Sequence, residues 1–268
     1  MKLSTETRNK ILRGEPIEII GLPLYPLKME HYLEWQSLKE VLLLRQARLP
    51  IDYISMPFLA ALYAMDFDTQ KAVGTAAGFM SKICYLLLLA LRLPITAKNV
   101  FSIRVDAQDK RKLLAINVQF GETLVDITPS LFNKMRPVLA EQNGEKLPDE
   151  ADNLDLIDTE IVLAASNGPA LEQDFNTLFA SVAYQLGLRA HELLDWTIYE
   201  FSAARAAIER DKMFTICALA EKAGGAKFTK GNPYPSWCLD KKREGTAALE
   251  SMGSFMSRMG SSGAVGMR

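Results

Sequence analysis

The chain has 268 residues, of which 49% are apolar and 24% charged, so it is long and apolar enough to bury a substantial core. Its 31 lysines and arginines nearly balance its 32 acidic residues. The resulting net charge of −1 argues against a protein built mainly to bind nucleic acid.

The cysteines and the hydropathy pattern indicate a protein of the cytoplasm that makes no membrane contact. Cys84, Cys217 and Cys238 are odd in number and share no C-x-x-C spacing, which favours reduced thiols over a disulfide framework. The most apolar run, residues 83–94, is shorter than the ~20 residues of a membrane-spanning helix. The polar N-terminus lacks the apolar stretch of a secretory signal.

The first part of the chain, residues 1–97, is predicted to be helical after a short extended segment at residues 16–20. From Lys28 apolar residues recur at steps of three and four, which predicts a helix that continues to Pro50. Two further helices are predicted over residues 55–65 and 69–93.

The period then changes, and residues 98–145 are predicted to form a small antiparallel β meander with a covering helix. Three short runs alternate apolar and polar residues between polar turns: 101–105, 113–120 and 124–128. Only one face of such a sheet is apolar, so we expect the helix predicted over residues 130–142 to pack on it. Asn143-Gly144 supplies a stop signal for that helix.

Residues 146–172 are predicted to be an acidic linker. Asp149, Asp152, Asp155 and Asp158 invite comparison with a calcium-binding loop. Ala151 and Leu154 stand where a loop starting at Asp149 needs a ligand and a turn glycine, so a solvated linker is the preferred interpretation.

Residues 173–244 are predicted to form a second helical part, followed by a Gly/Ser/Met-rich tail at residues 245–268. One helix is expected over residues 175–186 with Gly187 as its C-terminal cap, and a longer one from about Asp195, as N-cap, to Gly224-Gly225. The predicted fold class is therefore α+β, predominantly α-helical, with helical N- and C-terminal parts and the β meander between them.

No pattern in the sequence predicts a catalytic residue, a cofactor or a metal site. The only histidines are His31 and His191, no phosphate-binding loop is present, and the cysteines are too far apart for a zinc motif. Asp195, Glu200 and Glu209 lie near arginines at helical spacing, which favours surface ion pairs over paired acid and base.

A stiff aromatic segment follows the long helix, and we call residues 228–245 the strap. Its Pro233-Tyr234-Pro235 sequence is restricted to extended geometry, so ordering it costs little entropy. The strap either pins the tail to the core through Tyr234 and Trp237 or displays these two rings to a partner.

The tail carries an apolar pattern rich in methionine. Leu249, Met252, Met256 and Met259 would share one face of a short helix, with Phe255 beside them. Methionine faces adapt to partners of variable shape, whereas Gly253, Gly260, Gly263 and Gly266 favour a loosely packed end. Both interpretations stay open at this point.

Several stretches resemble the tail assembly chaperone-like proteins of tailed phages and prophages of Gram-positive bacteria. They cover most of the chain and are, in order, IEIIGLPLYPLKMEHYLEW, DITPSLFNKMRPVLAEQNGEKLPDEA, DWTIYEFSAARAAIERDKMF and GAKFTKGNPYPSWCLDKK. The chain departs from the smallest such chaperones by its length and its central β meander.

The resemblance implies a non-enzymatic protein of the host cytoplasm that binds the tape-measure protein before the tail tube polymerises. Tail-tube subunits and self-association are further partners that it allows. Tyr199 is an expected partner contact, together with the aromatic residues of the strap and the apolar residues of the tail: Tyr234, Trp237, Leu249, Met252, Phe255, Met256 and Met259.

Three alternatives remain at this stage. A structural component of the tail, neck or baseplate would stay in the virion. An enzyme of unknown type would need a concave site around His31 or His191. A nucleic-acid module, the least favoured, would need a continuous basic face that includes Lys227, Lys230, Lys241, Lys242 and Arg243.

Overall fold

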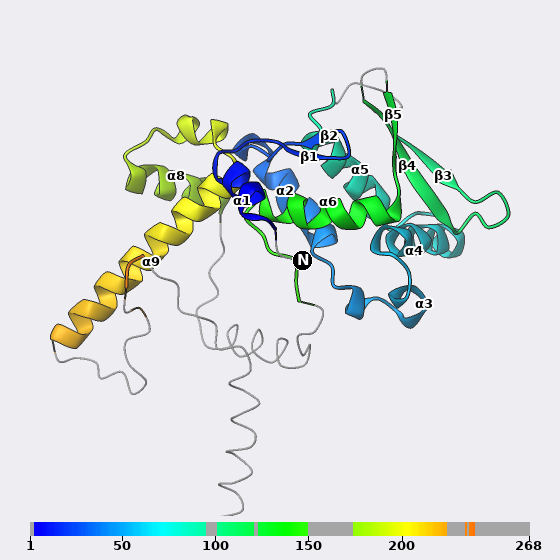
Figure 1. The fold of residues 1–268 in the computed structure, drawn as a ribbon. Helices are drawn as coiled ribbons and strands as arrows, with labels where there is room; N and C mark the ends of the chain where they lie inside the picture. The colour runs from blue at the N-terminus through cyan, green and yellow to red at the C-terminus, as the bar shows by residue number, and fades with distance from the viewer. Residues whose placement is uncertain are drawn as a thin grey trace, which may run out of the picture. The chain divides into compact units, whose positions relative to one another are not determined.

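The computed structural model describes residues 3–94, 101–120, 123–149, 174–223, 234 and 236–238. The chain divides into two compact units, an N-terminal unit through Arg205 and a C-terminal unit from Ala206, with the boundary inside the last helix (Figure 1). The fold is α+β and predominantly helical, with a small antiparallel sheet in the middle of the sequence, as the sequence predicts.

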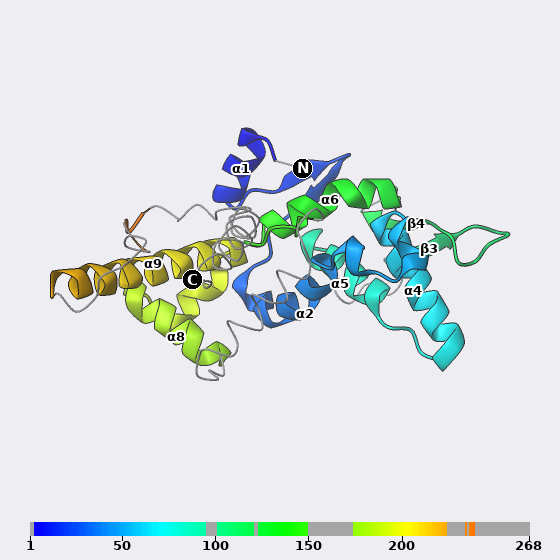
Figure 2. The same ribbon diagram turned by 90° about the horizontal axis from the view of Figure 1, so that it is seen from below.

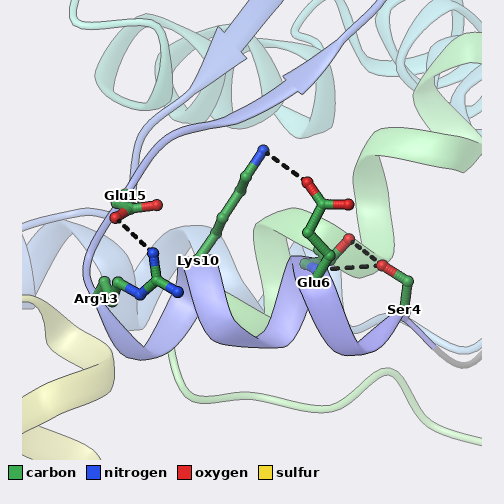
Figure 3. A network of polar contacts seen from close by, with 6 residues as sticks. Ser4, Glu6, Lys10, Arg13 and Glu15 are labelled. Atoms are coloured by element: carbon green, nitrogen blue, oxygen red, sulfur yellow. Dashed lines mark hydrogen bonds and ion pairs between the residues drawn. The ribbon is translucent and has the colours of Figure 1, made fainter.

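The N-terminal unit begins with a helix that sequence reasoning missed, α1 (Thr5–Leu12). Ser4 caps it by accepting a hydrogen bond from the Thr7 amide, and ion pairs Lys10–Glu6 (3.4 Å) and Arg13–Glu15 (3.3 Å) lie along and just beyond it (Figure 3). Its mostly polar residues give a weak apolar period, which explains why the pattern did not reveal it.

A tight hairpin follows, made of β1 (Ile17–Ile19) and β2 (Leu22–Leu24). Ile20 and Gly21 form its two-residue turn, both with positive φ (51° and 76°), as a type I′ turn requires. The extended segment predicted at residues 16–20 is confirmed as β1. The second strand was missed because the neighbouring Pro and Gly residues read as a loop.

The next helix is shorter than predicted: α2 spans Tyr32–Leu42 after the short 3-10 helix η1 (Met29–His31), and does not reach Pro50. A distant side chain accounts for the early end. Arg136 donates from Nε to the carbonyl oxygen of Leu42 (2.8 Å) and from an Nη to that of Leu44 (2.6 Å), which satisfies carbonyls at the helix end.

The break predicted between helices 55–65 and 69–93 lies further along the chain in the structure. After η2 (Gln46–Arg48) and α3 (Ile51–Ile54), α4 runs through Phe58–Val73 and α5 through Phe79–Ala90. Gly74 and Gly78, with φ of 85° and 88°, make the break. Asp66 therefore lies inside α4 rather than between helices.

The β meander is confirmed. Its strands are β3 (Phe101–Val105), β4 (Leu113–Phe120) and β5 (Thr123–Ile127), paired in the order β3-β4-β5 with every neighbour antiparallel. The register aligns Ile103, Ile116 and Ile127 in one row, and Ser102, Asn117 and Asp126 in the adjacent row. One face of the sheet therefore carries apolar residues and the other polar ones.

The helix predicted over residues 130–142 is α6 (Pro129–Glu141), capped by Thr128, and both α6 and α4 pack against β4. α6 also reaches the β1–β2 hairpin, which Figures 1 and 2 show at its other end. There Gln142 Nε2 donates to the Leu24 carbonyl, and Asn143 Oδ1 accepts from the Leu27 amide at 2.9 Å.

The second helical part begins with α8 (Phe175–Leu186), whose bounds and C-cap Gly187 are as predicted. Asp174 is its N-cap, which the sequence analysis did not identify. The 3-10 helix η3 (Ala190–Asp195) leads to α9 (Ile198–Lys222). The N-cap predicted at Asp195 is wrong, because Thr197 and Glu200 cap α9 reciprocally: each side chain accepts from the other's amide.

Four aromatic rings join α8 to the rest of the N-terminal unit. Phe175 stacks on Tyr32, Phe179 contacts Phe175 and Phe201, and Tyr32 meets Phe201 edge-on, with ring centroids 5.2–6.0 Å apart.

Within the described ranges, every helix is too short or too polar to cross a membrane.

Candidate functional site

A cleft of about 990 Å³ lies in the N-terminal unit, and it contains one of the predicted partner contacts. α1 contributes Arg8 and Leu12, the chain leaving α6 contributes Leu147 and Pro148, and the first turn of α9 contributes Tyr199. The lining combines apolar and polar side chains, a mixture that suits a polypeptide segment.

The chain that leaves α6 is held in place by close packing at Gly144. Gly144 has a φ of 77°, and a Cβ at this position would lie 3.0 Å from Ser202 Cβ on α9. Glu145 then pairs with Lys39 of α2 at 2.9 Å. These contacts fix the wall of the cleft next to Tyr199.

The charges around the cleft are mixed. Arg8 and Lys146 are basic, whereas Glu141 and Asp149 are acidic. A site for phosphate or nucleic acid would gather one sign of charge, so this cleft gives no support to an anionic ligand.

The second surface of interest is an exposed apolar stripe in the C-terminal unit. Met213, Ile216 and Leu219 are 37%, 58% and 62% exposed. Residues three apart on an α-helix lie about 60° from one another around the axis, so these side chains share one face of α9. We call this set the α9 stripe; Cys217, the next residue after Ile216, is buried instead.

The described residues of the strap leave its tryptophan accessible. Trp237 is 62% exposed and Tyr234 is 36% exposed. The Cys238 amide donates to Ser236 Oγ at 3.3 Å, which closes a small local turn beside Trp237. An exposed indole is what display to a partner requires.

The other predicted partner contacts lie outside the described residues: Leu249, Met252, Phe255, Met256 and Met259. Their place in the fold therefore stays a prediction, as do the predicted boundaries of the acidic linker and the tail. The basic residues Lys227, Lys230, Lys241, Lys242 and Arg243 also lie outside the described residues.

The titratable groups of the described residues do not form a recognisable catalytic arrangement. His31 Nε2 lies 3.8 Å from Glu30 Oε1, and His191 is exposed. Burial raises the pKa of the Cys84 thiol to about 11, which disfavours the nucleophilic thiolate. Among the described residues, His, Cys, Asp and Glu nowhere gather in a group of three that could hold a metal ion.

One polar cluster, Tyr53–Asp68–Arg111, combines a phenol, a carboxylate and a guanidinium. Tyr53 donates to Asp68 Oδ2 at 2.8 Å, and Arg111 Nε lies 2.9 Å from the same oxygen. The hydrogen bond to Asp68 raises the pKa of Tyr53, so this phenol is not prepared to act as a base. The cluster instead fastens the β3–β4 hairpin to α3 and α4.

Sequence reasoning missed the α9 stripe, although its signal is present. The exposed apolar side chains follow three-residue steps from Met213. Apolar residues nearly surround the second half of α9, so the period alone does not decide which face is left uncovered.

Comparison with models of protein families, with curated proteins and with solved structures gives no match.

Proposed function

We propose that this protein is a non-enzymatic tail assembly chaperone that binds the tape-measure protein of a phage or prophage before the tail tube polymerises. The observation that carries the proposal is the α9 stripe, because a soluble chain gains little from leaving three large apolar side chains of one helix face in water. The resemblance of four sequence stretches to tail assembly chaperone-like proteins supports it.

The stripe suits a helical client. Met213, Ile216 and Leu219 extend over about 9 Å of the helix axis, and an amphipathic client helix could cover them with its own apolar face. Fully burying one such side chain stabilises a complex by about 1.5–3 kcal/mol. Three anchors therefore give a contact that competing tail-tube subunits can replace.

Trp237 is a second anchor in the proposal, since large exposed aromatic rings contribute strongly to polypeptide interfaces. Tyr199 and the cleft beside it would receive a separate segment of the client. In this proposal the protein acts in the host cytoplasm and is absent from the finished virion.

The test is co-expression with the tape-measure protein of the same genome, followed by affinity capture and quantification of both chains. We expect stoichiometric capture by the full chain and a loss of at least about tenfold for Ile216→Glu, because a charge would be buried against the client. Ala207→Glu is the matched control, because it adds the same charge at an exposed position on the other side of α9. It should capture normally.

Two outcomes would count against the proposal. Failure of the full chain to capture the tape-measure protein, with the protein present in purified particles by mass spectrometry, would assign it to the tail, neck or baseplate instead. Equal losses for Ile216→Glu and Ala207→Glu would remove the α9 stripe from the client interface.

A further inference from the structure

The α9 stripe raises a separate question, which is what covers it when no client is present. We propose that the C-terminal segment Leu249–Met259 of the same chain packs as an antiparallel helix on the α9 stripe. The two apolar faces would then shield each other from water and from other chains until a partner separates them. This proposal concerns the chain alone and does not depend on the identity of the client.

The residue pattern of the segment matches the stripe. Leu249, Met252, Met256 and Met259 follow steps of three, four and three, the spacing of a helix face that packs along another helix. With Met256 opposite Ile216, an antiparallel alignment sets Met259 opposite Met213 and Gly253 beside Leu219. Methionine side chains fill irregular gaps, which suits a face containing a long, a β-branched and a γ-branched residue.

The length of the chain allows this contact. The described residues 236–238, drawn in orange, lie alongside α9 in both Figure 1 and Figure 2. Residues 239–248 connect them to Leu249, and ten residues in extended form span up to roughly 35 Å. The stripe itself covers only about 9 Å of the helix axis, so the segment can reach it without leaving its own unit.

The charges of the two segments are compatible with the antiparallel direction. In that alignment Glu250 lies opposite Lys222, and Arg258 lies within about one turn of Asp211. Exposed ion pairs are weak, so the apolar faces supply the affinity.

Hydrogen exchange followed by mass spectrometry tests the contact in the full chain without any client. Four chains are compared: the unmodified protein, Met256→Glu, Ser254→Glu and a chain lacking residues 245–268. We expect amides of residues 213–222 to exchange at least about fivefold faster in Met256→Glu and in the shortened chain. Ser254→Glu, on the opposite face of the predicted tail helix, should exchange like the unmodified protein.

Equal exchange of residues 213–222 in all four chains would overturn the proposal. So would protection that rises with protein concentration, because a second copy would then be the cover. Amides of the N-terminal unit serve as the folding control, since none of the changes lies in it. A failure to capture the tape-measure protein would leave these results unaffected, so the two proposals fail separately.

A photo-crosslinking amino acid at position 216 gives an independent readout. Irradiation of the monomer should link this position to peptides that contain residues 249–259. Crosslinks confined to dimers, or to other peptides of the same chain, would overturn the assignment of this segment as the cover.

Discussion

Asp66 is a buried carboxylate whose hydrogen bonds join one helix to the start of the next. Its oxygens accept from the amides of Phe79 (3.1 Å) and Met80 (2.6 Å), the first residues of α5. Gly78, the N-cap of α5, has no side chain for this task. A carboxylate at this end also interacts favourably with the helix dipole, so Asp66 replaces a local cap.

We predict that Asp66→Ala lowers the free energy of unfolding by about 3 kcal/mol, because two amide groups lose a charged acceptor in a buried site. Asp66→Asn retains one acceptor oxygen and should lose about half as much. Urea unfolding followed by circular dichroism measures both changes. Asp52→Ala, at an exposed position of α3, is the control and should be nearly neutral. A neutral Asp66→Ala would contradict the assignment.

The hydrogen bonds made by Asp66, Arg136 and Asn143 could not be predicted from the sequence. Each satisfies backbone groups of a segment that is distant in sequence or belongs to another helix. Such pairings depend on the tertiary fold and leave no local pattern. Gly187, by contrast, caps the helix that it directly follows, so the end of α8 was predicted from a local signal.

At the scale of elements, the N-terminus of α8 responds to pH through Asp174. Its carboxylate accepts hydrogen bonds from the Thr177 amide (3.0 Å) and hydroxyl (2.9 Å). The Thr177 amide is the main cause that lowers the pKa of Asp174 below its ordinary value of 3.8. A depressed pKa means that the folded state favours the ionised carboxylate, so protonation weakens the cap.

We therefore predict that α8 loses this stabilisation as the pH falls through the pKa of folded Asp174, and keeps it fully above pH 3.8. Amide exchange of the first turn of α8, corrected for its intrinsic pH dependence, should show increased opening at the acid end. Asp174→Asn should abolish this pH response while retaining a cap of similar geometry. The same acid response in Asp174→Asn would show that another group is responsible.

Elements were predictable where the apolar period is clear and the ends of the element are marked by local residues. The three strands and α6 have sustained alternation or helical spacing, and their predicted bounds lie within one residue of those observed. α1 is too polar to produce such a pattern. The strands of the β1–β2 hairpin are too short, and Pro and Gly residues lie among them. Of the candidate surfaces, the sequence analysis named Tyr199 but not the α9 stripe. Whether the side chains of the stripe are exposed depends on tertiary contacts, which the local sequence does not determine.

At the scale of the whole molecule, the four aromatic rings join segments of the N-terminal unit that are far apart in sequence. Tyr32 of α2 contacts Phe175 of α8 and Phe201 of α9. Backbone hydrogen bonds from Met29 to Trp196 and from Ile198 to Leu27, both 2.9 Å, reinforce the same junction. Segments from both ends of this unit therefore share one core and should unfold together.

Phe179 tests this shared core because it lies on α8 yet is only 8% exposed. We predict that Phe179→Ala lowers the free energy of unfolding by about 3 kcal/mol, through the cavity left among the rings. Because unfolding is shared, amides of α2 should lose protection as much as those of α8. Tyr184→Ala, 81% exposed on the same helix, should change neither. If only α8 lost protection, α8 would be a separately unfolding element, and the rings would join two cores rather than complete one.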